Sequence, residues 1–421
     1  MPKKLKKLLS RMGPGFITGA SDDDPSGIAT YSQTGALFGY SQLWTAIFSF
    51  PFMSVIQEMC GRIGMVTGSG LSGVIRKNYT KSVLYFAVTL LLLANTVNIG
   101  ADLGAMASAG QLLLGLPFIV WLLSITALTL VLEIFVSYKV YARFLKYLTF
   151  SLFAYIIVAF IVKQDWLKIA VSTFVPTISP SKEYFLNIVA ILGTTISPYL
   201  FFWQADEEVE EEVELHKIRV MGKGVPKITR IDIKEMRIDT VVGMFFSQVV
   251  MFFIIVTTAS TLFSHGITNI NTATDAAEAL RPIGGNFTFV LFALGVLGTG
   301  LLAVPVLSGA ASYAISEAFG WKEGLYRKFK QAHGFYGVIT IATIVGLLVN
   351  FTSIPPFKML YYTAVLNGII APPLMVLILL ISNNKKIMGK YTNGKPSNIM
   401  GWLITAVMTL AALALLSTFF V

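Results

Sequence analysis

Long apolar stretches alternate with short polar segments along nearly the whole of this 421-residue chain. A helix that crosses a bilayer needs about 20 predominantly apolar residues, and eleven stretches satisfy that requirement. The pattern therefore predicts an all-α polytopic membrane protein with eleven transmembrane helices. The predicted spans cover residues 12–38, 41–65, 83–113, 116–137, 143–163, 184–205, 239–264, 286–316, 334–352, 357–381 and 399–420.

The composition excludes most other classes of protein. Hydrophobic residues make up 55% of the chain and charged residues only 13%, whereas soluble domains carry about 25% charged residues. Soluble enzymes, nucleic-acid-binding proteins and disordered proteins are excluded on this ground. The single cysteine, Cys60, excludes an internal disulfide framework and a CxxC motif. The three histidines lie in polar stretches, so we expect no histidine metal cage within the membrane and no cofactor.

The basic residues are divided unequally between the two sides of the membrane. If the N-terminus is cytoplasmic, 26 of the 32 lysines and arginines fall on the cytoplasmic side and five on the opposite side. An excess of Lys and Arg is typical of cytoplasmic loops. We therefore predict an integral protein of the plasma (inner) membrane, with its N-terminus cytoplasmic and its C-terminus outside. The basic tail 1–11 is expected to rest on anionic membrane lipid.

The first span is interrupted by acidic residues in its middle. Asp22, Asp23 and Asp24 are consecutive, and Pro25 and Gly27 follow closely. A charged residue at mid-membrane costs roughly 2.5–3.5 kcal/mol on insertion scales and is a functional-site hypothesis by default. Pro25 removes a backbone N–H and disrupts the preceding turn. We predict a helix that is broken in mid-membrane, with free carbonyl groups beside a carboxylate.

The sixth span contains a second break. Its middle carries Thr194, Ser197 and Pro198 between apolar segments. Two interrupted helices in corresponding positions of two halves point to the substrate site of an inverted-repeat transporter. We predict that helices 1–5 and 6–10 form two halves of opposite topology. The chain, 1–421, is then a single transporter domain that consists of the tail 1–11, a first repeat 12–163, a second repeat 184–381 and an additional helix 399–420.

The polar groups at the two breaks suit a hard divalent cation. Carboxylate, hydroxyl and carbonyl oxygens favour Mg²⁺, Ca²⁺ or Mn²⁺, whereas softer metals favour sulfur and imidazole. Mg²⁺ keeps several of its waters and binds through one or two carboxylates. The deep carboxylate of Asp24 and its small neighbours meet that requirement. The predicted partner is thus a divalent metal ion that is carried as substrate.

Five segments carry a family resemblance. They are DPSGIATYSQTGA (24–36), IQEMCGRIGMVTGSGL (56–71), GADLGAMASAGQLLLGLP (100–117), ISPYL (196–200) and KKIMGKY (385–391). In these segments the chain resembles the natural resistance-associated macrophage protein (Nramp) family of divalent metal transporters, and the likeness runs over most of its length. The resemblance implies a LeuT-type fold of two inverted five-helix repeats. It also implies broken helices 1 and 6 and alternating access around a site between them.

The resemblance further implies which residues bind the metal. The family's binding Asp is Asp24 here, and its carbonyl-donating position falls on Thr194. Its binding Asn falls on Gly27 and its binding Met on Ser197. Loss of the thioether removes the donor that discriminates transition metals from alkaline-earth metals. The predicted metal-binding positions are therefore Asp24, Gly27, Thr194 and Ser197.

Departures from the family at other positions affect the prediction about proton coupling. The family's His after Met-Pro is Tyr199, its helix-three Asp is Ile99 and its helix-three Glu is Asp102. The combination is similar to the Nramp-related magnesium transporter branch, which is described as carrying Mg²⁺ and Mn²⁺ without proton coupling. We predict the uptake of Mg²⁺, and also of Mn²⁺, without protons. The residues predicted to border the ion path are Asp22, Asp23, Tyr199, Asp102 and Asn367.

Three other functions are compatible with parts of the pattern. The main alternative is a proton-coupled Mn²⁺ or Fe²⁺ symporter of the Nramp family. A sodium-coupled organic-solute carrier has the same fold, although the aspartates of helix 1 would repel an anionic substrate. A membrane-embedded aspartyl protease would use Asp24 and Asp102 as its catalytic pair. The oligomeric state stays open, and a monomer is sufficient for alternating access.

Three further polar features receive structural interpretations. Glu58 and Arg62 are four residues apart near the end of helix 2 and are expected to form a salt bridge. The acidic segment 206–214 is expected to be a solvated helical extension of helix 6. Asn367 in helix 10, if it does not border the path, is expected to hydrogen-bond a neighbouring helix.

Overall fold

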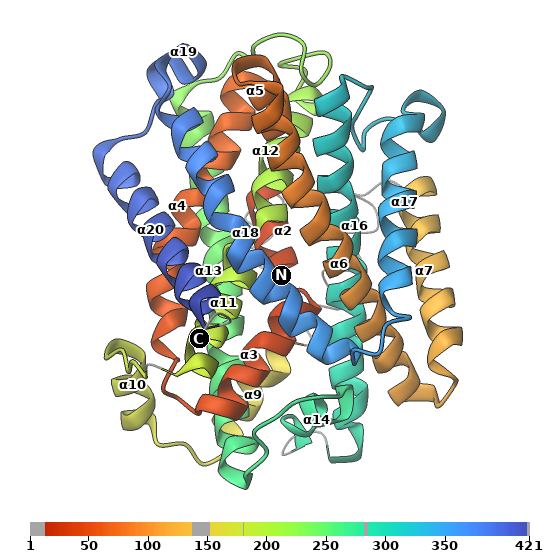
Figure 1. Ribbon diagram of the computed structural model, residues 1–421, viewed down its shortest axis with the longest axis vertical. Helices are drawn as coiled ribbons and strands as arrows, with labels where there is room; N and C mark the ends of the chain where they lie inside the picture. Colours follow the sequence, from red (N-terminus) through yellow and green to blue (C-terminus); the bar gives the residue numbers. More distant parts are fainter. Residues whose placement is uncertain (1–12, 137–151, 180, 282–284, 419–421) are drawn as a thin grey trace, which may run out of the picture.

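The computed structural model describes residues 13–136, 152–179, 181–281 and 285–418, and the regular elements in this part of the chain are all helical. Most of the long helices run side by side along one axis of the molecule (Figure 1). Seven spans in the described ranges are long and apolar enough to cross a membrane. The fold is therefore all-α, as the sequence predicts.

The elements are named here in chain order. They are α2 (Pro14–Asp22), α3 (Pro25–Phe38), α4 (Trp44–Thr67), α5 (Leu71–Asn78), α6 (Lys81–Leu114), α7 (Phe118–Phe135), α9 (Phe153–Ile161), α10 (Trp166–Phe174), α11 (Lys182–Thr195), α12 (Pro198–Glu214), α13 (Arg230–Thr261), η2 (Phe263–His265), α14 (Ala273–Glu278), η3 (Gly285–Phe287), α16 (Thr288–Phe319), η4 (Phe329–Gln331), α17 (His333–Val349), α18 (Pro356–Asn383), α19 (Lys385–Met388), η5 (Gly389–Tyr391) and α20 (Lys395–Ser417).

A described helix lies at the position of each predicted span. The seven long apolar spans are α6, α7, α11 with α12, α13, α16, α18 and α20, and the remaining positions are occupied by α2 with α3, α4, α9 and α17. For the fifth predicted span only the later part, α9, falls within the described residues. The tail 1–11 lies outside them. Short helices such as α5, α10 and α14 were not predicted, because they are too short to show a spanning pattern.

Both predicted breaks are present, and they have the same local design. Asp24 and Ser197 each adopt an extended backbone conformation immediately before a helix that starts with proline. Proline suits the first position of a helix, since its missing N–H has no intrahelical acceptor there. The residue before a proline is steered away from the helical region. The Asp24–Pro25 and Ser197–Pro198 dipeptides therefore end one helix and start the next.

The broken helices are held by close backbone contacts with unbroken ones. A Cβ atom on Gly19 of α2 would lie 2.3 Å from the carbonyl carbon of Gly243 in α13. A Cβ atom on Gly193 of α11 would lie 2.0 Å from the carbonyl oxygen of Ala364 in α18. Small residues allow such approaches between membrane helices. Each break is thus positioned by a rigid neighbouring helix.

The basic loops gather at one end of the bundle. Figure 1 shows α5 and α19 at one end and α10 and α14 at the other. The segments with the most Lys and Arg residues in the described ranges, 217–237, 322–330 and 385–395, follow α12, α16 and α18 at the end that carries α5. This arrangement is the one that the predicted distribution of charge requires.

For the acidic segment 206–214, the predicted helical extension is confirmed and the predicted solvation is wrong. The segment does extend helix 6, as part of α12, but most of it is buried rather than solvated: Asp206 is 0% exposed and Glu208 1%, whereas its last residue, Glu214, is exposed. The helix α12 packs against α4 and α16. Glu210 accepts hydrogen bonds from the hydroxyl of Tyr313 and the backbone N–H of Leu325.

The same buried region includes an acidic residue of the loop after α16. Burial, together with the nearby carboxylate of Glu317, raises the pKa of Glu323 to about 9. Glu323 therefore holds its proton more tightly than an exposed carboxyl group does. The predicted salt bridge between Glu58 and Arg62 is confirmed at 3.0 Å, and Arg237 of α13 joins Glu58 at 2.8 Å.

Candidate functional site

The carboxylate of Asp24 lies at the first break and caps α3. Its Oδ1 accepts hydrogen bonds from the backbone N–H of Gly27 at 2.7 Å and from the hydroxyl of Ser26 at 2.6 Å. A side-chain acceptor at this position satisfies N–H groups that the helix leaves free. Gly27 fits because a Cβ atom there would already lie 3.2 Å from the carbonyl oxygen of Asp22. The break therefore fixes one oxygen of the carboxylate by local bonds.

The second oxygen of Asp24 is reached from two other helices. Its Oδ2 lies 3.2 Å from the amide nitrogen of Asn98 in α6 and 3.3 Å from the hydroxyl of Tyr199 in α12. The Tyr199 hydroxyl also lies 3.0 Å from the carbonyl oxygen of Ser21 at the end of α2. A phenol has one proton to donate, so that proton is shared between two acceptors. Helices 1, 3 and 6 thus converge on one carboxylate.

The second break supplies neutral oxygen atoms. The hydroxyl of Ser197 donates toward the carbonyl oxygens of Gly193 at 2.8 Å and Thr194 at 2.7 Å. The hydroxyl of Thr194 lies 3.4 Å from that of Ser26. This contact connects the two breaks directly. The structure therefore brings Asp24, Gly27, Thr194 and Ser197 into one region, although whether they bind the metal stays a prediction.

The region is closed to solvent on all sides. Asp24, Thr194, Ser197 and Tyr199 are each 1% exposed. A buried charge is costly unless it is paired or hydrogen-bonded. Asp24 meets that condition through its four donors, and these donors hold the carboxylate in place at the centre of the bundle.

Two residues of the predicted path form a separate group beside the site. The hydroxyl of Ser247 in α13 lies 2.5 Å from Oδ2 of Asp22 and 3.4 Å from Oδ1 of Asp23. Oδ1 of Asp22 has no hydrogen-bond partner among the described residues. Asp22 is 0% exposed. Two carboxylates therefore share one hydroxyl immediately next to Asp24.

The other two predicted path residues are not joined to the site by hydrogen bonds. Asp102 is buried one helical turn after Asn98 on α6, and neither of its carboxylate oxygens has a partner in the described part of the chain. Asn367 is buried in α18, and its amide nitrogen likewise lacks one. The hydrogen bond expected between Asn367 and a neighbouring helix is therefore not made by its amide nitrogen, and for its side-chain oxygen the expectation stays a prediction.

The structure adds residues that the sequence did not single out as part of the site. Asn98 bonds to Asp24, and Ser247 bonds to Asp22 and Asp23. Asn98 precedes Asp102 by one turn in an apolar span, and Ser247 with Gln248 forms a polar pair in another. Isolated polar residues in apolar spans are the signal that could have found them.

The atoms of this site that could coordinate a metal ion are oxygens. The groups that bond to Asp24 are hydroxyls and amides. Among the described residues, no group of three or more His, Cys, Asp or Glu side chains is arranged to hold a metal ion. A cation here would combine one carboxylate with neutral oxygens, which is the donor set of hard divalent ions.

Sequence comparisons identify relatives over nearly the full chain. The Nramp family profile, described as natural resistance-associated macrophage protein-like, matches residues 15–418. Divalent metal cation transporter MntH of Caldanaerobacter subterraneus is 26% identical over 427 residues, which cover 99% of this chain and 94% of that protein. MntH of Bacillus subtilis is 26% identical over 406 residues, which cover 95% of this chain and 90% of that protein.

Solved structures share the fold. The Eremococcus coleocola manganese transporter aligns with a TM-score of 0.77 at 17% identity, covering 98% of this chain and 87% of that one. Mhp1, a nucleobase-cation-symport-1 family transporter, aligns with a TM-score of 0.59 at 14% identity, covering 96% and 90%. These likenesses confirm the predicted LeuT-type fold. The relatives are transporters for which the metal ion is the substrate, so the aspartyl protease alternative is wrong. The chain belongs to the Nramp family and is a divalent metal cation transporter.

Proposed function

We propose that this protein carries Mg²⁺, and also Mn²⁺, into the cell by alternating access and without coupled protons. The ion binds between the two helix breaks. The N-terminus faces the cytoplasm, and the repeats 12–163 and 184–381 move against each other around the ion. The unequal distribution of basic residues supports this orientation. The basic segments 217–237, 322–330 and 385–395 all lie at the end of the bundle that carries α5 (Figure 1).

The hydroxyl of Ser197 is the observation that supports the choice of ion. It lies at the second break, on the carbonyl oxygens of Gly193 and Thr194, at the position where the family resemblance expects a methionine. A hydroxyl is a hard donor, whereas a thioether favours softer transition metals. With Asp24 as the carboxylate, the site offers a donor set that does not reject Mg²⁺.

Small residues support binding of a partly hydrated ion. Mg²⁺ dehydrates reluctantly and tends to keep several waters. Gly27 and Ser197 are smaller than the Asn and Met that the family resemblance expects at these positions, so fewer atoms have to move when the breaks separate to admit an ion with its waters. Bonds from Ser26, Asn98 and Tyr199 to Asp24 can be exchanged for contacts with the waters of the ion.

The membrane potential is sufficient to drive uptake. One elementary charge that moves through 100 mV gains about 2.3 kcal/mol, so a divalent ion gains roughly 4.6 kcal/mol. At 1.4 kcal/mol per tenfold change this equals an accumulation of about 2,000-fold. No second ion is needed to concentrate the metal, which supports a carrier without proton coupling.

We place Asp22 and Asp23 on the inner part of the ion path. They lie at the end of α2, between the N-terminal side of the bundle and Asp24, and share the hydroxyl of Ser247. A dication that leaves Asp24 toward the cytoplasm would meet these carboxylates next. Their charge would stabilise the ion as the inner side opens.

A proton-coupled Mn²⁺ or Fe²⁺ transporter is the second candidate, and Asp102 favours it. Its carboxylate is fully buried one turn from Asn98 and has no hydrogen-bond partner among the described residues. A carboxyl group in such surroundings can carry a proton. The names of the relatives, which include a manganese transporter, are compatible with this candidate.

Uptake into proteoliposomes under an imposed potential tests the proposal. Mg²⁺ and Mn²⁺ are compared while the internal pH is recorded. We expect Mg²⁺ entry without acidification. Mn²⁺ entry with acidification and without Mg²⁺ transport would favour the second candidate instead.

A further inference from the structure

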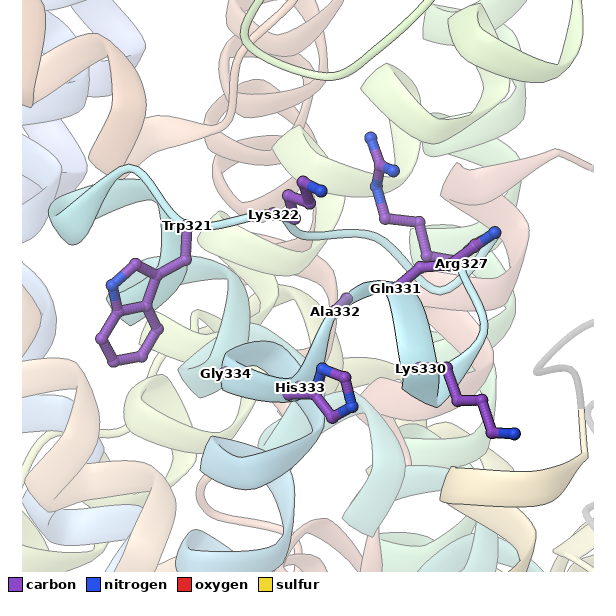
Figure 2. A pocket seen from close by; sticks show the side chains of 8 residues that line it. All are labelled: Trp321, Lys322, Arg327, Lys330, Gln331, Ala332, His333 and Gly334. Atoms are coloured by element: carbon purple, nitrogen blue, oxygen red, sulfur yellow. The ribbon is translucent and has the colours of Figure 1, made fainter.

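A basic cavity lies between the end of α16 and the start of α17, at the end of the bundle that carries α5. Its volume is about 600 Å³, and Figure 2 shows the side chains that line it. They come from the loop after α16, from η4 and from the first turn of α17. The lining residues with charged or aromatic side chains are Trp321, Lys322, Arg327, Lys330 and His333.

The basic side chains of this cavity form no salt bridge with the acidic residues that the structure describes. Lys322, Arg327 and Lys330 take part in none of the ion pairs of the described residues. Arg327 is held in place, because its Nε donates to the carbonyl oxygen of Glu323 at 2.9 Å and its guanidinium lies over the ring of Tyr326. The carboxyl group of Glu323 interacts electrostatically with Arg327, so the positive charge that the cavity presents without a paired acid is that of Lys322 and Lys330.

The start of α17 adds backbone donors to the same cavity. His333 and Gly334 belong to its first turn and line the cavity. The first N–H groups of a helix have no intrahelical acceptor and attract anions. α17 has 17 residues, so its N-terminus carries the full dipole of a long helix. Side chains and backbone thus favour the same kind of ligand, an anion.

An aromatic rim connects the cavity to the outer surface of the bundle. Trp321 is 47% exposed and stacks on Phe319, which is 57% exposed, with ring centroids 5.4 Å apart. The ring centroid of Tyr85 in α6 lies 6.4 Å from that of Phe319. The indole of Trp321 also packs over the Cα of Gly334, where an added Cβ would lie 2.7 Å from the ring. Exposed aromatic rings of this kind are typical of the boundary between lipid and water.

We propose that this cavity binds the phosphate headgroup of an anionic phospholipid from the leaflet at this end of the bundle. Phosphate is the chemistry that cations and helix N–H groups recognise together. A free phosphate ion shares that chemistry. The aromatic rim favours the lipid, because it leads from the cavity to a surface where acyl chains can pack. The inference does not depend on which metal the protein carries.

Lipid titration of the purified full chain tests the proposal. The probes are phosphatidylglycerol, phosphatidylcholine and inorganic phosphate, added to the detergent-solubilised protein, with bound lipid counted by native mass spectrometry. We expect one phosphatidylglycerol to bind in preference to phosphatidylcholine. The double variant Lys322→Gln/Lys330→Gln should bind it about 30-fold more weakly, since each basic residue near anionic lipid contributes about fivefold.

Two further variants make the result specific. Lys385→Gln/Lys386→Gln removes the same charge from two exposed lysines at the same end of the protein, outside the cavity, and should leave the preference unchanged. Lys322→Arg/Lys330→Arg keeps the charge and should restore binding. Equal loss in the cavity and control variants would overturn the site. Displacement of phosphatidylglycerol by inorganic phosphate at similar concentration would overturn the lipid as its occupant.

Discussion

The two helix breaks share one backbone arrangement, an extended residue followed by a helix that starts with proline, but their side chains have opposite roles in hydrogen bonding. At the first break, the carboxylate of Asp24 accepts bonds from its own helix and from α6 and α12. At the second, the hydroxyl of Ser197 donates to carbonyl oxygens of the turn that it has just left. One break therefore gathers donors around a negative charge, whereas the other occupies its own carbonyls with a neutral group.

This difference separates charge from selectivity. Asp24 is the acidic residue at the first break that lies nearest the second through Ser26 and Tyr199, so we expect it to supply the electrostatic attraction for a cation between the breaks. Ser197 and Thr194 contribute neutral oxygen donors, and the type of donor determines whether the site prefers hard or soft metal ions. Changes at the first break should affect whether an ion binds. Changes at the second should affect which ion binds.

The largest effect is expected at the charge itself. Asp24→Asn removes the negative charge but keeps a good helix cap, since Asn and Asp are equally favoured there. We expect Mg²⁺ uptake to fall by about 100-fold or more, because a charge-assisted interaction contributes up to ~3 kcal/mol. Initial rates of uptake into proteoliposomes measure this. Asp275→Asn, at the capping box of α14, is the matched control and should transport normally.

A change of donor at the second break should alter selectivity instead. Ser197→Cys replaces the hydroxyl by a softer sulfur of similar size. We expect the ratio of Cd²⁺ to Mg²⁺ uptake to rise about tenfold, equivalent to ~1.4 kcal/mol. Competition between the two ions measures the ratio, with Ser197→Thr as the control that keeps a hydroxyl. An unchanged ratio would mean that Ser197 does not face the ion.

Removing a bond that joins the two halves should have a smaller effect. Tyr199→Phe deletes the hydroxyl between Asp24 and the carbonyl oxygen of Ser21. We expect the KM for Mg²⁺ to change about fivefold, since a neutral hydrogen bond contributes about 1 kcal/mol. Tyr362→Phe, at a tyrosine that is exposed on α18, is the control and should leave KM unchanged. The same change in both variants would contradict a role for Tyr199 at the site.

The smallest effect is expected on the inner path. Asp23→Asn leaves Asp24 in place and removes one of the two charges around Ser247. We expect kcat to fall about threefold while KM changes little. The weaker attraction of the ion to the inner path slows its release, whereas the binding site around Asp24 is unaltered. Transport at saturating Mg²⁺ measures this change. A loss as large as that in Asp24→Asn would move Asp23 from the path to the binding site.

Local chemistry made the two breaks predictable from sequence. Asp24–Pro25 and Ser197–Pro198 each place a small polar residue before a proline, in the middle of an apolar span, and the side chain of Asp24 also caps α3. The restriction of backbone angles by proline acts on neighbouring residues only. The positions of the breaks, the cap of α3 and the identity of the central carboxylate follow from those neighbours.

The partners of Asp24 were not predictable in the same way. Asn98 and Tyr199 reach it from α6 and α12, which are 74 and 175 residues away along the chain. The burial of most of the acidic segment 206–214 also depends on the packing of α4 and α16 against α12. Both depend on packing between helices, and a charge pattern that is typical of a solvated helix does not report it.

The ratio of charge moved to metal transported tests the central claim most directly. Current and Mg²⁺ flux are measured together in proteoliposomes that contain the wild-type protein, with Asp24→Asn as the inactive reference. The account predicts two elementary charges for each Mg²⁺ ion. Three or more charges for each ion would show that protons accompany the metal, and would contradict a carrier driven by the membrane potential alone.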